Sequence, residues 1–154
     1  MKPFLLLVSL IALPMSAETL QWRGDVRAGA FSEGNHPVVW TIEGEARYGN
    51  WAFAPAAEFL AISDNTRAMH ADIRRIFSLE HSTLWLGAGP TLVNSDTPGN
   101  AQTWNVDAGL SWNKGQRWEP CVAARFYSFR IPIFRDVIEG KGAVVSLGIS
   151  RRFH

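Results

Sequence analysis

Apolar and polar residues alternate one by one along most of the chain after residue 20. In the segment LQWRGDVRAGAF at residues 20–31, Trp22 and Val26 fall on one parity and Arg23 falls on the other. Successive side chains of a β-strand point to opposite faces, so this pattern predicts a strand with one apolar and one polar face. The alternation leaves open which face is inside. In a soluble barrel the apolar side chains fill the core, whereas in a membrane barrel they face lipid.

The same alternation recurs and predicts eight strands. Clear examples besides the first lie near residues 40–48, 104–112, 118–127 and 145–153, and weaker ones lie near 51–62, 69–79 and 83–93. Each segment is about as long as a tilted membrane-spanning strand needs to be. An even number of such segments is typical of bacterial outer-membrane barrels.

The predicted connections alternate between short and longer segments. The short ones are hairpin turns at 49–50, 80–82 and 113–116, and the longer ones are loops at 32–37, 63–68, 94–102 and 130–139. Outer-membrane barrels have short periplasmic turns and longer outer loops. We therefore predict an all-β fold, an eight-stranded antiparallel up-and-down transmembrane β-barrel with both termini in the periplasm.

The polar faces of the predicted strands carry arginines and carboxylates in similar numbers. The interior of an eight-stranded barrel is only wide enough for side chains to fill it. Buried charges are costly unless they are paired, so we expect these groups to form a charge network that closes the lumen. A solvated face of mixed charge on a soluble domain is the alternative. The residues of this predicted lumen network are Arg23, Asp25, Arg27, Glu43, Glu45, Arg47, Glu58, Asp72, Arg74, Asp107, Glu119, Arg125 and Arg152.

Aromatic residues on the apolar parity lie near the ends of the predicted strands. Tryptophan and tyrosine favour the boundary between hydrocarbon and water, so two belts of such rings indicate a membrane barrel. Trp85 is an exception, because its parity points it into the lumen. The predicted aromatic girdle comprises Trp22, Trp40, Tyr48, Trp51, Trp104, Trp112, Trp118 and Phe153.

The first seventeen residues, MKPFLLLVSLIALPMSA, differ from the remainder of the chain. A positive start at Lys2, an apolar run over 4–13 and small residues ending at Ala17 predict a secretory signal peptide at 1–17, which leaves 18–154 as the barrel. The rest has no apolar run of about 18 residues. We therefore expect an exported chain without a membrane helix.

Composition excludes several function classes. A net charge of +1 lacks the basic excess typical of nucleic-acid binding. The single cysteine, Cys121, allows no internal disulfide and no paired-cysteine metal site, and we interpret it as a small apolar filler. The histidines (His36, His70, His81 and His154) lack metal-ligand spacing, so we interpret them as solvated and expect no metal or cofactor.

Two features do not fit a regular barrel. Arg75 falls on the lipid-facing parity, which predicts either a bulge at Arg74–Arg75 or a side chain that reaches the interface. Pro55, Pro90 and Pro120 each remove a ladder hydrogen bond from a closed sheet. Pro55 and Pro120 lie near predicted turns, whereas Pro90 has no explanation in the sequence.

The end of the chain is similar to the C-terminal recognition signal of bacterial outer-membrane proteins. Ser146, Gly148 and the closing aromatic Phe153 match that pattern, whereas Arg151 stands where an apolar residue is usual and His154 follows the aromatic. The chain from residue 18 resembles small barrels of the OmpA/OmpX type. That resemblance is one of architecture and implies no single activity. We expect outer-membrane lipid and lipopolysaccharide as surroundings and the barrel-assembly machinery as a partner during insertion; the sequence leaves the oligomeric state open, with a monomer as the expectation.

The segment RFYSF at 125–129 and the loop after it resemble the corresponding part of lipid A 3-O-deacylases. In that resemblance Ser128 matches the nucleophile and Glu139 lies near the acid, but Phe126 occupies the histidine position. Without an imidazole nothing takes the serine proton. We therefore predict that the chain is not an enzyme, and we keep a lipid A-modifying hydrolase as an alternative.

The segment RIPIFRDVIEG at 130–140 combines basic and apolar residues. Its basic groups are suited to phosphates and its apolar groups to acyl chains of lipopolysaccharide, although the apolar groups could instead pack over the barrel mouth. The candidate contacts are Arg130, Ile131, Ile133, Phe134 and Arg135. The sequence thus predicts a non-enzymatic barrel with a role in envelope structure or surface interaction. A soluble lipocalin-like periplasmic barrel that carries an apolar ligand is a further alternative.

Overall fold

The computed structural model of the chain describes residues 20–32, 38–60, 66–95, 99–133 and 136–153. The predicted signal peptide lies outside these ranges. None of the described residues forms a helix long and apolar enough to cross a membrane. The strands are β1 (Gln21–Phe31), β2 (Val38–Tyr48), β3 (Trp51–Leu60), β4 (Arg67–Ser78), β5 (Ser82–Ser95), β6 (Gly99–Trp112), β7 (Trp118–Ile133) and β8 (Asp136–Phe153).

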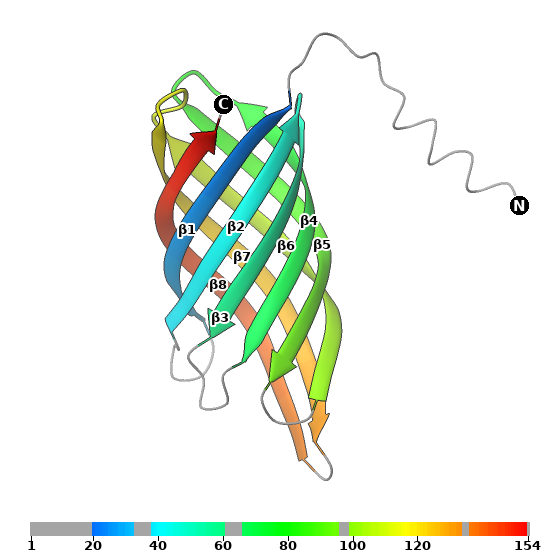
Figure 1. Cartoon of the computed structure of the whole chain (residues 1–154). Helices are drawn as coiled ribbons and strands as arrows, with labels where there is room; N and C mark the ends of the chain where they lie inside the picture. The colour runs from blue at the N-terminus through cyan, green and yellow to red at the C-terminus, as the bar shows by residue number, and fades with distance from the viewer. Residues whose placement is uncertain (1–19, 33–37, 61–65, 96–98, 134–135, 154) are drawn as a thin grey trace, which may run out of the picture.

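Each strand pairs antiparallel with its neighbour in sequence, and β8 pairs back onto β1 to close the barrel. The eight predicted strands and their up-and-down antiparallel order are therefore confirmed. The strands cross the barrel at a marked tilt, and β1 starts at the same end as β8 finishes (Figure 1). Closure removes the free sheet edges that would otherwise leave backbone groups unpaired in lipid.

The apolar faces of the strands point outward. In β2, Trp40 and Ile42 are 55% and 56% exposed, whereas Thr41 and Glu43 between them are buried. Valine, leucine and isoleucine side chains are likewise exposed on β1, β4, β5 and β8. A soluble barrel would bury these side chains, so the structure contradicts the lipocalin-like alternative.

The interior holds two apolar clusters besides its polar groups. Near the end of the barrel where β1 finishes and β2 starts, called the loop end, the buried cluster is Phe31, Val39, Ala68, Val93, Ala101, Tyr127 and Val144. Near the opposite end, the turn end, it is Ala52, Ile76, Trp85, Cys121 and Ala123. The buried Cys121 thus fills apolar space, as predicted. Apolar packing at both ends restricts water access to the polar groups between the clusters.

β5, β6, β7 and β8 run further at the loop end than the sequence predicted, so the predicted alternation of short and longer connections fails after β5. The predicted loop at 94–102 is wrong, because β5 runs to Ser95 and β6 starts at Gly99. The predicted loop at 130–139 is wrong as well, because β7 and β8 continue as a hairpin that extends past the other strands (Figure 1). At 94–102 polar residues fall on both parities, so no alternation marks a strand there. In β7 the apolar residues change parity after Tyr127, since Phe129, Ile131 and Ile133 fall on the parity that is inward in the rest of the strand.

The turn end is built from tight connections. Gly49 and Gly115 adopt positive φ of 59° and 90°, and Asn113 adopts 57°. Gly49 belongs to the two-residue turn 49–50, which needs this left-handed backbone, and Asn113 and Gly115 belong to the longer connection 113–117. Glycine and asparagine tolerate such backbone best. Short turns thus hold β2 to β3 and β6 to β7 in register.

The three prolines lie at interruptions or ends of the ladders. Pairing of β4 with β5 is absent between His70–Thr91 and Ile73–Ala88, opposite Pro90. The carbonyl of Gly89 instead accepts a hydrogen bond of 3.1 Å from Asn105 Nδ2. A side-chain donor therefore compensates for a missing ladder contact beside Pro90.

Arg75 causes no bulge. β3 and β4 stay in register through Trp51–Arg75 at the turn end, so the bulge alternative is wrong. Its guanidinium carbon lies 5.1 Å from the centre of the Trp51 ring. Arg75 thus stands outward at the end of the barrel, where an arginine costs much less than at the midplane of a bilayer.

Glycine 109 makes room for the interior tryptophan, and its replacement tests this packing. A Cβ on Gly109 would overlap the Trp85 ring, whereas a Cβ on Gly44 would have no heavy atom within 4 Å. We predict that Gly109→Ala lowers the free energy of unfolding by about 1–3 kcal/mol, because an overpacked core must shift. Urea unfolding in lipid vesicles would measure this, with Gly44→Ala as the control. Equal effects of the two substitutions would contradict the packing.

Candidate functional site

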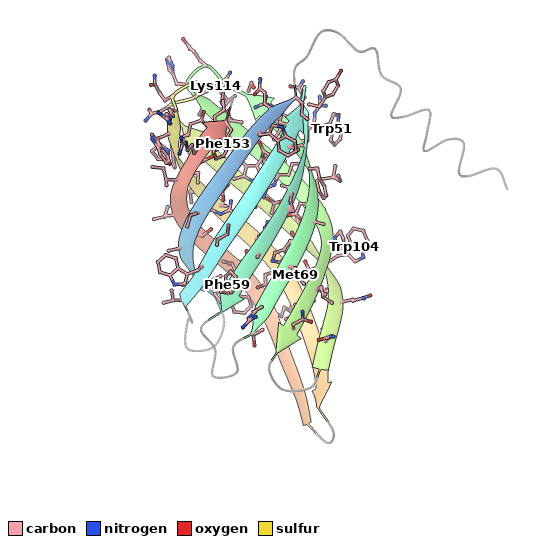
Figure 2. All side chains as sticks on the ribbon, viewed as in Figure 1. Trp51, Phe59, Met69, Trp104, Lys114 and Phe153 are labelled. Atoms are coloured by element: carbon pink, nitrogen blue, oxygen red, sulfur yellow. The ribbon has the colours of Figure 1, made fainter. Side chains whose placement is uncertain are left out.

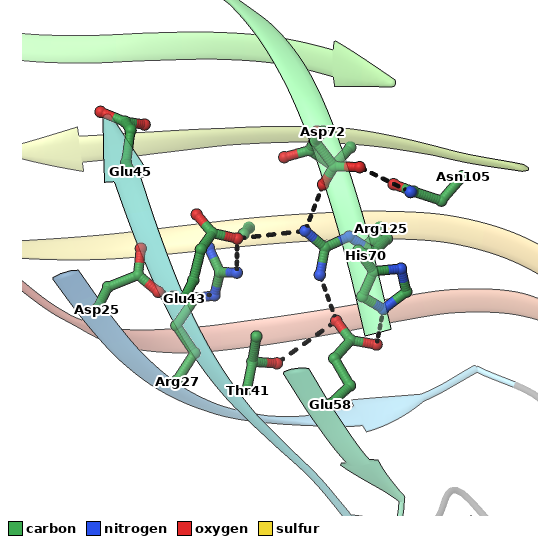
Figure 3. A network of polar contacts seen from close by, with 12 residues as sticks. Asp25, Arg27, Thr41, Glu43, Glu45, Glu58, His70, Asp72, Asn105 and Arg125 are labelled. Atoms are coloured by element: carbon green, nitrogen blue, oxygen red, sulfur yellow. Dashed lines mark hydrogen bonds and ion pairs between the residues drawn. The ribbon is translucent and has the colours of Figure 1, made fainter. Parts of the chain in front are cut away.

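Glu43 stands at the centre of a charged network inside the barrel. Both of its oxygens accept hydrogen bonds from the Arg74 guanidinium. Its Oε2 atom also lies 2.8 Å from Arg27 Nη2 and 3.2 Å from Arg125 Nη2. Glu43 is only 4% exposed, so one carboxylate from β2 binds buried arginines of β1, β4 and β7. Figure 3 shows Glu43 with Arg27 and Arg125.

Arg125 connects this centre to two further carboxylates. Its Nη1 donates to Glu58 Oε1 at 2.6 Å, and its Nη2 donates to Asp72 Oδ2 at 2.7 Å (Figure 3). These residues come from β7, β3 and β4. Charge-assisted hydrogen bonds of this kind are about twice as strong as neutral ones. Residues far apart in the sequence are thus tied together across the lumen.

Arg74 and Trp85 carry the network towards the turn end. Arg74 Nη2 lies 2.6 Å from Asp107 Oδ2, and the Trp85 ring nitrogen donates to the same oxygen at 3.0 Å. The Arg74 guanidinium also lies 5.5 Å from the centre of the Trp85 ring. Trp85 is buried, in agreement with its predicted lumen parity. Gly87 is needed beside them, because a Cβ there would overlap Arg74 and Asp107.

A second cluster lies around Glu119 at the turn end. Arg152 Nη2 is 2.8 Å from Glu119 Oε1, and Arg23 Nη2 is 3.5 Å from Glu119 Oε2. Ser111 and the backbone of Gly115 also donate to this carboxylate. The Glu119 carboxylate thus has two arginine partners and two neutral hydrogen-bond donors at the edge of the lumen.

Three residues of the predicted network take part less closely. One oxygen of Asp25 lies 3.6 Å from the Arg27 guanidinium. One oxygen of Glu45 lies 3.6 Å from the Arg74 guanidinium. Arg47 donates to the carbonyl of Gly49 and to Ser78, so its resolved hydrogen bonds go to uncharged groups. Arg47 therefore stabilises the turn after β2 rather than the charged centre.

Sequence reasoning missed several interior polar groups, of which His70 is the most important. Its interpretation as a solvated histidine is wrong. The ring is buried, with Nε2 3.2 Å from Glu58 Oε2 and Nδ1 2.8 Å from Thr91 Oγ1. Parity could have found it, because His70 is two residues before Asp72 and therefore on the same face.

Tyr127 and Asn105 are two further interior partners. The Tyr127 hydroxyl donates to Glu58 Oε2 at 3.2 Å, and Asn105 Nδ2 donates to Asp72 Oδ1 at 2.7 Å. Each brings a neutral donor to a carboxylate that Arg125 also binds. The network therefore combines charged and neutral partners. Strand parity places both kinds on the inner face, whereas a search for charged residues alone misses the neutral ones.

The residues of the predicted aromatic girdle all point outward. Trp51 and Phe153 lie at the turn end, and Phe59 and Met69 lie nearer the loop end (Figure 2). Trp104, at 72% exposed, lies between them rather than at a strand end, because β6 begins five residues earlier, at Gly99. Trp104 therefore departs from the predicted position at the end of its strand, because β6 extends beyond the predicted start.

The predicted catalytic and lipopolysaccharide residues are only partly described. Phe126 and Ser128 both point outward from β7, and Ser128 pairs across the ladder with Lys141. The backbone of Arg130, Ile131, Ile133 and Glu139 belongs to the β7–β8 hairpin, but their side chains lie outside the described structure, as do Phe134 and Arg135. Among the described residues, no group of three or more histidine, cysteine or acidic side chains could hold a metal ion.

A closed antiparallel barrel of eight strands, apolar outside and charged inside, has the fold of the small bacterial outer-membrane barrels. No family model and no curated protein matches the sequence. Solved structures do match, and all of those compared below share no more than 15% of aligned residues with this chain.

Three natural proteins are among the matching structures. The N-terminal β-barrel domain of Pseudomonas aeruginosa OprF has a TM-score of 0.64 at 12% identity and covers 88% of this chain and 99% of its own. Neisserial surface protein A has a TM-score of 0.62 at 15% identity, covering 87% and 97%. Ail of Yersinia pestis has a TM-score of 0.59 at 12% identity, covering 88% and 99%. At these identities the similarity shows the fold alone.

Replacing Glu43 tests whether the interior depends on its charge. We predict that Glu43→Gln lowers the free energy of unfolding by roughly 3 kcal/mol or more, because Arg27, Arg74 and Arg125 lose their shared counter-charge. Urea unfolding in lipid vesicles, followed by tryptophan fluorescence, would measure it. Glu45→Gln is the matched control on the same strand and should cost much less. If the two variants were equally stable, the central role of Glu43 would be refuted.

Proposed function

We propose that this chain is a non-enzymatic protein of the bacterial outer membrane that contributes to envelope structure or surface interaction. The observation that carries the proposal is the outward orientation of its apolar faces around a closed barrel. Such a surface is stable when hydrocarbon covers it, since an exposed apolar area of this extent would aggregate in water. The fold shared with outer-membrane barrels supports the same location.

The proposed orientation has the turn end in the periplasm. The connections at the end where β1 starts and β8 finishes are 49–50, 79–81 and 113–117, whereas the other end carries the two longest connections, 32–37 and 61–66, and the extended β7–β8 hairpin (Figure 1). Outer-membrane barrels have short periplasmic turns and longer extracellular loops. The extended β7–β8 hairpin would then reach outward from the membrane.

We propose lipopolysaccharide as the contact of this hairpin, through Arg130, Ile131, Ile133, Phe134 and Arg135. We also propose the barrel-assembly machinery as a partner during insertion.

The interior is proposed to act as a closed plug. Its buried charges are paired across the lumen, and an apolar cluster lies on each side of them. An eight-stranded barrel leaves no room for an aqueous channel once side chains fill it. Structural support of the barrel therefore explains the interior better than transport of a solute does.

Heat-modifiable migration on a gel tests the proposed class of protein. We predict that the protein extracted in detergent migrates differently before and after boiling in SDS, because a closed barrel keeps its strand hydrogen bonds in detergent until it is heated. Migration that is unchanged by boiling, together with recovery of the unboiled protein in the soluble fraction, would overturn the proposal.

Conductance tests the plug separately. In planar bilayers we predict little or no steady ion current from the folded protein, because the paired side chains fill the lumen. A folded barrel that nevertheless showed a large and steady conductance would contradict the plug without affecting the membrane location.

Lipid A analysis tests the absence of enzymatic activity. We predict that the mass spectrum of lipid A stays unchanged when the protein is expressed, because Phe126 offers no base beside Ser128. The control is Ser128→Ala, expressed at the same level. Loss of an acyl chain with the wild-type protein and not with this variant would establish the hydrolase alternative.

A further inference from the structure

Three arginines gather at the turn end, on the wall formed by β7 and β8. Arg117, Arg151 and Arg152 line a surface depression of about 540 Å³ together with Gly115 and Phe153. A backbone hydrogen bond from Arg152 to the carbonyl of Arg117, at 3.4 Å, holds the β6–β7 turn beside the end of β8. The depression is therefore formed by two segments that are more than thirty positions apart in the chain.

Arg151 has an unusual position for a charged residue. It follows Ile149 and precedes Phe153 on the outward parity of β8, both of which are exposed. Its guanidinium carbon lies 5.2 Å from the centre of the Trp118 ring and 5.4 Å from that of Phe153. Contacts of a cation with aromatic rings position the charge but do not neutralise it.

The three guanidinium groups differ in how they are neutralised. Arg152 turns inward and pairs with Glu119. Within the described part of the chain, no carboxylate lies within ion-pair distance of Arg117 or Arg151, and Arg151 Nε is buried without a hydrogen-bond partner. Two positive groups with free donors thus face one depression at the edge of the apolar wall.

We propose that Arg117 and Arg151 bind the phosphate of an anionic phospholipid headgroup. The inference rests on the proposed membrane location, which puts Trp118 and Phe153 at the boundary between hydrocarbon and water. Guanidinium groups bind phosphate oxygens through paired hydrogen bonds. An anionic lipid is favoured over a zwitterionic one because two uncompensated positive charges attract its net negative charge. The aromatic rings would contact the upper part of its acyl chains.

Arg75 provides a matched control on the other side of the barrel. It also points outward at the turn end and stacks on a tryptophan, Trp51. It differs because it lies on β4 and does not line the depression on β7 and β8. Removing its charge therefore tests general attraction of the rim for anionic lipid without altering the proposed site.

The experiment is native mass spectrometry of the folded barrel in neutral detergent with phosphatidylglycerol or phosphatidylcholine added. We expect the wild-type protein to retain phosphatidylglycerol in preference to phosphatidylcholine. The double variant Arg117→Gln/Arg151→Gln should lose about tenfold in apparent affinity, as expected for removal of charge-assisted hydrogen bonds. Arg75→Gln should retain the wild-type preference. If the double variant does not fold, the single variant Arg117→Gln replaces it in the experiment, because Arg117 lies in an exposed turn.

Three results would overturn the proposal. One is equal retention of the two lipids by wild-type protein, and another is an equal loss with Arg75→Gln, which would indicate only general rim charge. The third is full displacement of the lipid by inorganic phosphate, which would indicate a site for the free anion. Heat-modifiable migration of the same samples distinguishes failure of the headgroup site from failure of the proposed membrane location. A folded, heat-modifiable barrel without lipid preference refutes the headgroup site and leaves the membrane location standing.

Discussion

The neutralisation of charge inside a closed ring of strands is the constraint on which this structure depends. Glu43 shows it most directly, because its two oxygens bind guanidinium groups from three other strands. Removing such charges from water is costly, and only close pairing with further hydrogen bonds offsets that cost. Each partner must therefore arrive from its own strand in a fixed register. The pairing thus specifies the arrangement of strands as well as stabilising it.

Apolar packing and small residues make this arrangement possible. Clusters around Val93 at the loop end and Trp85 at the turn end lie on either side of the charged groups and limit their contact with water. Gly87 and Gly109 leave the space that Arg74 and Trp85 occupy, because a side chain at either glycine would overlap them. The narrow lumen therefore requires small and large residues to face each other across neighbouring strands.

The outer surface follows a different rule from the interior. Apolar side chains cover the wall, and outward arginines lie near its ends: Arg67 at the start of β4, and Arg75 and Arg151 at the turn end, where they stack on aromatic rings. A charged group on the wall is tolerated there because its head can reach water or a lipid headgroup. Arg151 stands where an apolar residue is usual in the C-terminal strand, and it lines the same depression as Arg117.

Alternation along the sequence determined the eight strands and the two faces of each, because side-chain direction in a strand follows residue parity alone. The hairpin connections between them indicated their up-and-down order. It also placed Trp85 and the interior arginines. Tertiary structure decided which groups meet, since Arg125 reaches Glu58 and Asp72 only after the barrel closes. His70 was misread because a single residue does not reveal its partners on other strands. The length of the β7–β8 hairpin was missed because the apolar residues change parity after Tyr127, whereas strand pairing continues to Ile133.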